Sequence, residues 1–292
     1  MKHLIKRPLN IRMYFLLSFC MIALSSCDKS ITIPLDPLVY TPHLMIYGIA
    51  SPQSGALVNI EYNRPLSGLE DEVPNLPSLE VYLLVSGEKK YRFNEDSIGS
   101  FSLAPEEIDL KSTEGYSLWV RDLDLNVEYQ SAIEKLPIQP NILDDEILSV
   151  SDSQKVFVQI ILGEVDQPIE GYSIVTSLLD SNLVNLSSKS FRNKIRQMQI
   201  PDAVTWDEKP VTILINPEQY DMENEVVFYA PYVLIDVTYY SKGLALFSKD
   251  ASQYLSSGED IYQVVQPIYS NISGNHGVFG LYTEEEILVK LE

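Results

Sequence analysis

Hydrophobic and polar positions alternate with a period of two in short runs along much of the chain. From Leu44 to about Ile133, such runs are separated by Gly, Pro, Asn and Asp. The runs at 56–62, 79–85 and 116–120 each place their apolar residues on one face, as a half-buried strand requires. This pattern predicts an antiparallel arrangement of short strands in the first half of the chain.

Seven candidate strands can be counted in this region, which has the length of an immunoglobulin-like β-sandwich. We therefore predict such a domain over residues 43–140. The paired cysteines of many immunoglobulin domains are absent, so the pattern indicates the architecture alone. Pro137, Pro140 and the acidic residues at 144–146 favour a linker or an edge crossing, and we place the domain boundary near residue 140.

Residues 141–292 are predicted to form a second β-rich domain, because alternating apolar runs resume at Val156–Leu162 and return at the carboxyl end. Between residues 242 and 256 the period changes to threes and fours. This change predicts one amphipathic helix, which Gly258 is well placed to end. Its apolar face is formed by Leu244, Phe247, Ala251 and Tyr254. The expected fold class is therefore all-β, mostly antiparallel, with a single helix in the second domain.

The amino-terminal segment has the layout of a bacterial export signal. It opens with four basic residues, Lys2, Lys6, Arg7 and Arg12. An uncharged apolar run from Met13 to Leu24 follows. A helix of that length spans only about 18 Å, whereas the hydrocarbon layer of a bilayer is about 30 Å thick. The run is therefore too short for a permanent membrane span and indicates a cleavable signal peptide.

The residues Leu24-Ser25-Ser26-Cys27 resemble the lipobox of bacterial lipoproteins, in which an aliphatic and two small residues precede the cysteine that accepts the lipid. We predict a signal peptide over residues 1–26, lipidation of Cys27, and a tether over residues 27–42. The acylated cysteine would hold the protein on a lipid bilayer. The alternative is an ordinary secretory signal in which the cysteine occurs by chance. Cys20 would leave with the signal, so the mature chain would form no disulfide.

The body that follows is strongly acidic. The whole chain has 21 Lys and Arg against 41 Asp and Glu, and the predicted signal contains four of the basic residues and none of the acidic ones. Such a charge repels nucleic acid and anionic lipid surfaces, so we expect no nucleic-acid partner. The acidity serves either the solubility of an exported protein or the attraction of a cation or a cationic partner.

No set of residues predicts a catalytic site. His43 and His276 have no neighbouring cysteines or spaced carboxylates, which argues against a zinc site. No serine lies in a Gly-x-Ser-x-Gly elbow, and the cysteine at position 27 is predicted to carry lipid. We assign no catalytic residue, metal or cofactor. Because the paired carboxylates of glycoside hydrolases have no fixed spacing along the sequence, a hydrolase stays open as an alternative.

Asp122, Asp124 and Asn126 alternate as they do at the start of a calcium-binding loop. The glycine and the bidentate glutamate that complete such a loop are missing. A solvated turn is therefore the better interpretation.

Half of the 18 tyrosines fall between Tyr220 and Tyr282. Tyrosine combines a flat apolar ring with a polar tip, which suits sugars, peptides and protein partners. Alternation on strands offers a second explanation, in which many of these rings belong to the core. The candidate ligand-binding residues are Tyr229, Tyr232, Tyr239, Tyr240 and Tyr269.

The run from Pro267 to Gly280 resembles the closing motif of a family of Gram-negative outer-membrane lipoproteins called domain of unknown function 4249. That motif has a proline, then Ser-Asn-Ile, a glycine-rich turn and Gly-Val-Phe. This chain differs by placing Asn275 and His276 where consecutive glycines are usual. A purely structural explanation is that the turn packs Phe279 into the core. The motif residues of this chain are Asn271, Gly274, Asn275, His276, Gly277 and Phe279.

The resemblance implies an outer-membrane lipoprotein of two β-rich domains, often encoded beside a TonB-dependent transporter. The biochemical activity of the family is unknown. We therefore expect a non-enzymatic accessory or binding protein that is anchored through Cys27 and contacts a TonB-dependent transporter, a glycan or a peptide. A hydrolase acting on an exported polymer and a purely structural envelope protein are the alternatives. Both sides of the outer membrane stay open as its location.

Overall fold

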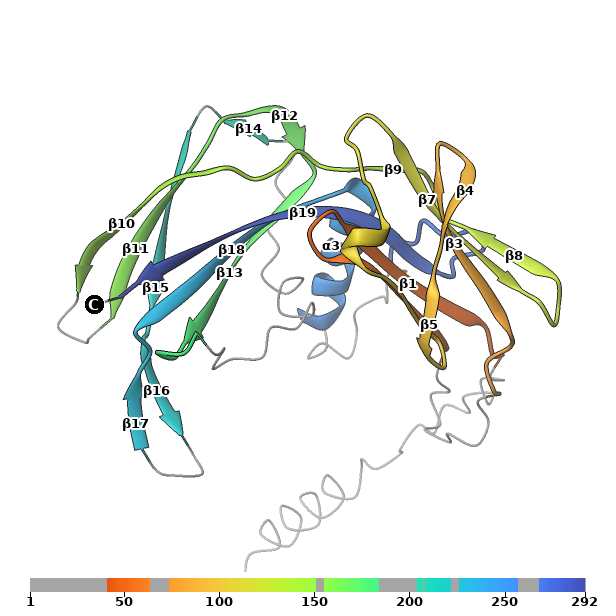
Figure 1. The fold of residues 1–292 in the computed structure, drawn as a ribbon, viewed down its shortest axis with the longest axis horizontal. Helices are drawn as coiled ribbons and strands as arrows, with labels where there is room; N and C mark the ends of the chain where they lie inside the picture. Colours follow the sequence, from red (N-terminus) through yellow and green to blue (C-terminus); the bar gives the residue numbers. More distant parts are fainter. Residues whose placement is uncertain are drawn as a thin grey trace, which may run out of the picture. The chain divides into compact units, whose positions relative to one another are not determined.

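The computed structural model shows an all-β protein with one α-helix in the part of the chain that it describes (Figure 1). The described residues are 41–63, 74–150, 155–183, 204–206, 208–221, 226–256 and 268–291. The predicted signal peptide, Cys27 and Gly258 lie outside these residues, and so does all of the predicted tether except residues 41 and 42.

Alternation of buried and exposed side chains produces nine short strands among the described residues of the first half. They are β1 (Leu44–Ser51), β2 (Gly55–Tyr62), β3 (Leu79–Val85), β4 (Glu88–Arg92), β5 (Asn94–Ser97), β6 (Ser100–Leu103), β7 (Gly115–Asp122), β8 (Val127–Gln130) and β9 (Glu134–Lys135). A 3₁₀ turn, η2 (Pro105–Glu107), precedes β7. The sequence predicted seven strands.

The strands of the first half form two sheets around one core. One sheet has the order β1-β2-β6-β5, and the other has the order β4-β3-β7-β8, with β9 paired to β7. Alternate residues of both sheets point inward, for example Ile46 and Val58 from the first and Leu83 and Leu118 from the second. Their side chains are almost fully buried, so this first core accounts for the period-two pattern of the sequence.

The described residues of the second half contain nine more strands before the last one. They are β10 (Ile142–Val150), β11 (Val156–Leu162), β12 (Val165–Ile169), β13 (Gly171–Leu179), β14 (Val204–Trp206), β15 (Lys209–Ile215), β16 (Glu218–Asp221), β17 (Val226–Tyr229) and β18 (Tyr232–Tyr240). The helix α3 (Lys242–Ser256) and the final strand β19 (Gly277–Lys290) follow. The predicted helix bounds, 242–256, are confirmed.

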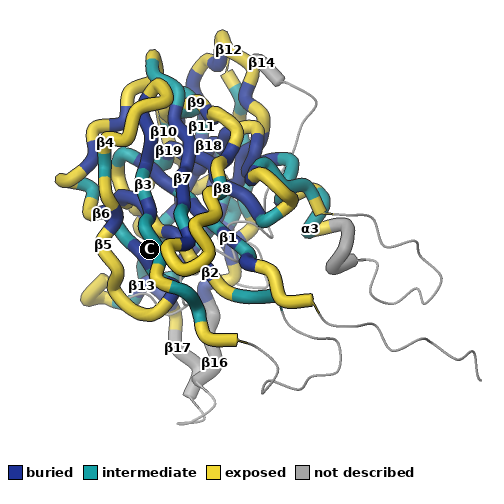
Figure 2. Tube along the Cα trace, turned by 90° about the vertical axis from the view of Figure 1, so that its right-hand side faces the viewer, coloured by how far each residue is buried: buried dark blue, intermediate teal, exposed yellow. Residues whose placement is uncertain are grey.

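A second core lies between the sheet β10-β11-β15 and the strands β13, β18 and β19. Val158 and Ile160 of β11 and Val233 and Ile235 of β18 are fully buried in it. Figure 2 shows long buried stretches in β18 and β19. The residues of this core come almost entirely from after residue 140, whereas most residues of the first core come from before it.

The last strand, β19, belongs to both halves. Its residues Gly277–Leu281 pair in parallel with Ile46–Ala50 of β1. Its residues Tyr282–Lys290 pair antiparallel with β18. Phe279 lies in the first core and Val289 in the second. A single seven-stranded sheet therefore runs across the predicted boundary, and residues 42–292 form one compact unit. The division into two separate domains stays a prediction.

Candidate ligand-binding groove

A groove of about 800 Å³ lies on the outer face of the sheet β1-β2-β6, next to α3. Because side chains alternate along a strand, the residues between the core positions of β1 and β2 point to this face. Tyr47 and Ile49 of β1 and Leu57 of β2 supply the apolar floor. Leu76 and Ile98 close one end, and Ile98 is 84% exposed.

Helix α3 forms one wall of the groove. Leu244 and Phe247, which lie three positions apart and so on one face of the helix, both line it. The Phe247 ring meets the Tyr47 ring edge-on, with the centroids 6.0 Å apart. Leu244 is fully buried in a small third core with Tyr240, Val278 and neighbours. The helix is thus held at its first turns, and its apolar face continues into the groove.

The other side of the groove is polar. Asn59 and Glu61 project from β2, and Ser100 begins β6. Burial, followed by the charge of Glu61, raises the pKa of the Tyr47 hydroxyl. Glu61 is therefore close enough to act on a group in the groove. The arrangement suits an elongated ligand that has an apolar body and one hydrogen-bond donor or positive charge.

A buried carboxylate holds α3 against the sheets. Glu134 of β9, only 6% exposed, accepts hydrogen bonds from the Gly243 backbone N–H at 3.1 Å and from the Asn271 side chain at 2.9 Å. Ser241 bonds to it as well. A Cβ on residue 243 would lie 2.4 Å from a Glu134 oxygen, so a side chain there would displace the Glu134 carboxylate. We call this group of Glu134, Ser241, Gly243 and Asn271 the helix latch.

The closing motif of the sequence contributes to the helix latch. Asn271 Nδ2 also donates to the Phe279 carbonyl at 2.7 Å, and the Phe279 N–H donates to Asn271 Oδ1 at 2.9 Å. Phe279 is fully buried in the first core. Asn271 therefore joins the motif to both β19 and Glu134, which agrees with the structural explanation of the motif.

The turn within the motif requires unusual backbone conformations. Gly274, Asn275 and Gly277 have φ values of +79°, +62° and +128°. Asparagine tolerates the left-handed region better than most residues, so Asn275 can occupy this position. A Cβ at Gly277 would lie 2.0 Å from the Ile46 carbonyl oxygen, so the close approach of β19 to β1 depends on this glycine.

The structure separates the five candidate tyrosines. Tyr239 and Tyr240 are each only 1% exposed, so the prediction that they lie on a binding surface is wrong. The reason is that both faces of β18 are covered, Tyr239 by the second core and Tyr240 by the third. Tyr229 is 51% exposed, and Tyr232 and Tyr269 are half-buried. None of the five is among the described residues that line the groove.

His276 and His43, which are far apart in sequence, lie side by side. Their ring centroids are 5.9 Å apart, and the Tyr129 ring is 4.6 Å from that of His276. The Nδ1 atom of His276 lies 2.6 Å from the Leu44 carbonyl oxygen. Within the described ranges, no group of three metal-binding side chains is present. The contacts of His276 with His43 and with the Leu44 carbonyl connect the start of β1 to the motif turn.

The turn that begins like a calcium loop is held by its own carboxylate. Asp122 is 1% exposed, and its Oδ1 accepts the N–H groups of Asp124 at 2.9 Å and Leu125 at 2.8 Å. The predicted turn is therefore present, but its first aspartate is buried rather than solvated. Its carboxylate is occupied by backbone donors, as in an Asx turn.

Neither a protein-family model nor a curated protein matches this chain. The likeness of the closing motif to the domain of unknown function 4249 family therefore stays a prediction. None of the helical segments in the described part of the chain has the length and apolarity needed to cross a bilayer. The fold and the groove define an all-β protein with a ligand-sized apolar site.

Proposed function

We propose that this chain is a non-enzymatic, lipid-anchored envelope protein that binds a ligand with an elongated apolar part in the groove beside α3. The groove itself carries this proposal. Its volume, about 800 Å³, is in the range of small-molecule sites, and apolar side chains from β1, β2 and α3 converge on it. Glu61 and Asn59 on one side would orient the ligand.

Binding is favoured over hydrolysis by the composition of the groove. A glycoside hydrolase needs two carboxyl groups about 5 to 10 Å apart across the substrate. Of the described residues that line the groove, Glu61 is the one carboxylate. A single acid on one side can orient a ligand, but it offers no acid and base pair.

The anchor is the predicted lipid on Cys27, and it completes the proposal. With a bilayer as its support, the protein would present the groove close to the membrane. The resemblance of the closing motif supports the outer membrane as the location and a TonB-dependent transporter as a partner. The ligand would then be captured for, or received from, that transporter.

We also assign the first half as an immunoglobulin-like sandwich. In the immunoglobulin fold the first, second, fifth and fourth strands form one sheet, and variable-type domains add a strand after the third in the other sheet. With β4 as that added strand, the order β1-β2-β6-β5 opposite β4-β3-β7-β8 follows this arrangement. The Tyr116 hydroxyl near the start of β7 accepts the Lys111 N–H, five residues upstream. A tyrosine bonded back to the chain in this way is a feature of such sandwiches.

A fluorescent probe tests the groove. N-phenyl-1-naphthylamine, an uncharged apolar dye, should brighten when it binds the full-length protein. Leu57→Lys, which places a charge on the groove floor, should weaken dye binding several-fold. Leu214→Lys on β15 is the matched control, because Leu214 is also an exposed strand leucine, at 52%, and does not line the groove. Equal dye binding by the wild type and both variants would contradict the proposal.

A further inference from the structure

The turn between β7 and β8 exposes aliphatic side chains where polar residues are usual. Leu123, Leu125 and Val127 are 46%, 71% and 40% exposed, and they fall within five consecutive positions. The bonds from the Asp124 and Leu125 N–H groups to Asp122 fix the backbone of this turn. The turn therefore presents Leu123 and Leu125 to the surroundings in a defined conformation.

A second turn, at the same end of the two sheets, also exposes an aliphatic residue. Ile98 is in the turn between β5 and β6, which contacts the end of β2 through a bond from the Ile60 N–H to the Gly99 carbonyl, 2.7 Å long. The segment before β3 connects the two turns. Leu76 and Ile98 both line the groove. Two residues after Leu76, the backbone carbonyl of Ser78 accepts a hydrogen bond from the Leu123 N–H at 2.9 Å.

The chain also enters the described body at this end. Leu44 pairs with Tyr62, the last residue of β2. His43 contacts His276, and His276 contacts Tyr129, which lies two residues after Val127 on β8. In Figure 1 the β7–β8 and β5–β6 turns and the start of β1 all lie at the lower right. The described chain therefore begins beside the exposed aliphatic turns.

We propose that these two turns, through Ile98, Leu123, Leu125 and Val127, contact the lipid surface to which the protein is anchored. We call them the membrane-facing turns. This inference rests on the lipid anchor of the proposed function. Pro42 is fifteen positions after Cys27, so the body cannot lie farther than about 50 Å from the acylated cysteine. Aliphatic side chains at the point of attachment would fix the orientation of a body that one tether alone leaves free to rotate.

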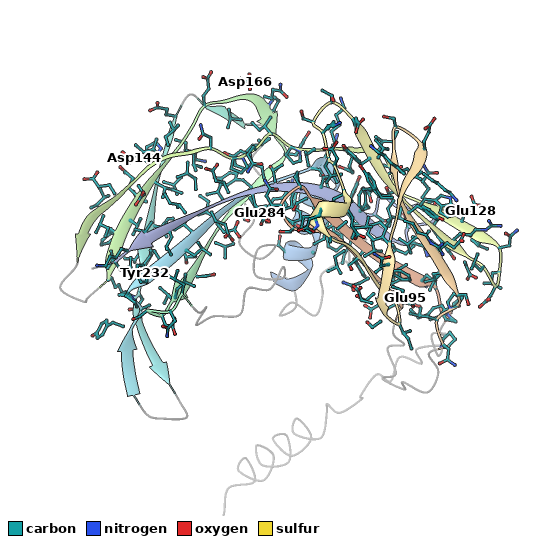
Figure 3. The ribbon with its side chains drawn as sticks, viewed as in Figure 1. Glu95, Glu128, Asp144, Asp166, Tyr232 and Glu284 are labelled. Atoms are coloured by element: carbon teal, nitrogen blue, oxygen red, sulfur yellow. The ribbon has the colours of Figure 1, made fainter. Side chains whose placement is uncertain are left out.

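The charges at this end select the kind of lipid. Glu95 and Asp96 adjoin Ile98, while Asp124 and Glu128 adjoin the leucines. Figure 3 shows Glu95 on β5 and Glu128 on β8 on this part of the molecule. These carboxylates repel anionic headgroups, whereas zwitterionic headgroups have no net charge to repel them. The proposed contact is therefore with a net-neutral lipid surface, such as phosphatidylcholine or phosphatidylethanolamine.

A matched pair of labelled cysteines tests the contact. Leu125→Cys and Ile133→Cys would each receive an environment-sensitive fluorophore in the full lipidated protein, which is then reconstituted into phosphatidylcholine vesicles. Ile133 is a suitable control because it is 66% exposed and lies against Gly115, the first residue of β7, at the opposite end of that strand. The two positions are roughly 20 Å or more apart along the strand.

Nitroxide-labelled lipids should quench the label at position 125 several-fold more than the label at position 133. Replacing part of the phosphatidylcholine by phosphatidylglycerol should reduce the quenching at position 125. Vesicle-bound protein with equal quenching at both positions would overturn the inference and leave the anchor intact. A brighter label at position 125 that lipid nitroxides do not quench would indicate a protein partner and would also overturn it. Failure of the protein to float with the vesicles would reject the anchor and this inference together.

Discussion

The two outer faces of the first half both carry aromatic side chains, but only one of them is open. On the outer face of β3 and β7, Tyr82 and Trp119 meet edge-on, and the Lys89 ammonium lies 3.0 Å from the centre of the Trp119 ring. We call this the sealed face. On the outer face of β1 and β2, Tyr47 meets Phe247 of α3, and the groove lies beside them. We call this the groove face.

The difference arises from what each sheet has above it. On the sealed face, Trp119 is only 5% exposed, because its own neighbours cover it, and its Nε1–H donates to Glu128 at 3.3 Å. On the groove face, α3 comes from the far end of the sequence and covers only part of the sheet. Apolar surface that a chain does not cover with its own side chains is available to a ligand. We therefore propose the groove face as the binding face.

The largest expected effect is a loss of stability, without a loss of dye binding, from a substitution on the sealed face. Trp119→Ala should lower the free energy of unfolding by about 3 kcal/mol, because it removes a large buried ring. Binding of N-phenyl-1-naphthylamine should not change, because Trp119 lies on the opposite sheet from the groove. Urea unfolding and dye titration measure the two quantities. A loss of dye binding by the folded variant would show that the two faces are not independent.

The next effect concerns the helix latch on the groove face. Glu134→Ala should lower the free energy of unfolding by about 2 kcal/mol, because it leaves buried donors of Gly243 and Asn271 without their acceptor. Unlike Trp119→Ala, it should also weaken dye binding, since α3 supplies a wall of the groove. Normal dye affinity in a destabilised Glu134→Ala protein would show that the latch does not position the wall.

The pH dependence of stability gives a smaller effect with a defined sign. Burial raises the pKa of Glu134 above its ordinary value, and the hydrogen bonds from Gly243, Ser241 and Asn271 offset this only in part. The folded state therefore favours the protonated acid. Its stabilising contribution is complete below the unfolded value of 4.5 and is lost as pH rises through the raised value.

Glu134→Gln provides the reference, because glutamine does not titrate. The free energy of unfolding of the wild type minus that of Glu134→Gln should fall as pH increases from about 4 to about 7. Urea titrations at several pH values measure this difference. A difference that rises with pH would mean that the ionised carboxylate is the form that the latch stabilises.

The sequence predicted local elements well and the groove not at all. Strand alternation and the threes and fours of Leu244 and Phe247 are local signals, so the all-β class and the helix bounds followed from them. The groove needs Tyr47 and Phe247 side by side, and it depends on parallel pairing of β1 with β19. No local pattern encodes such a long-range pairing.

The candidate tyrosines also show that local patterns do not encode the tertiary arrangement. Tyr239 and Tyr240 were both candidates for a binding surface, while alternation on strands offered the core as the second explanation. Both are buried because side chains pack on both faces of β18, those of β11 on the Tyr239 side and those of α3 on the Tyr240 side. Which faces of a strand are covered is decided by the tertiary arrangement and not by the strand itself.

The smallest expected effect tests why the sealed face is closed. Lys89→Ala should lower the free energy of unfolding by only about 0.5 kcal/mol, because a cation over an aromatic ring near the surface contributes little. It should, however, expose the Trp119 ring, so acrylamide should quench the tryptophan fluorescence more strongly. Lys90→Ala is the matched control, since Lys90 is the next residue of β4 and lies 5.1 Å from Tyr91 instead.

The same pair of variants connects the two faces. If Lys89 is what seals the aromatic pair of Tyr82 and Trp119, its removal should create a second, weaker dye site that the Leu57→Lys substitution on the groove floor does not affect. The closure of the sealed face would then depend on one side chain. Equal quenching and equal dye binding in Lys89→Ala and Lys90→Ala would instead mean that the sheet itself buries Trp119, and that the closure of this face does not depend on the lysine.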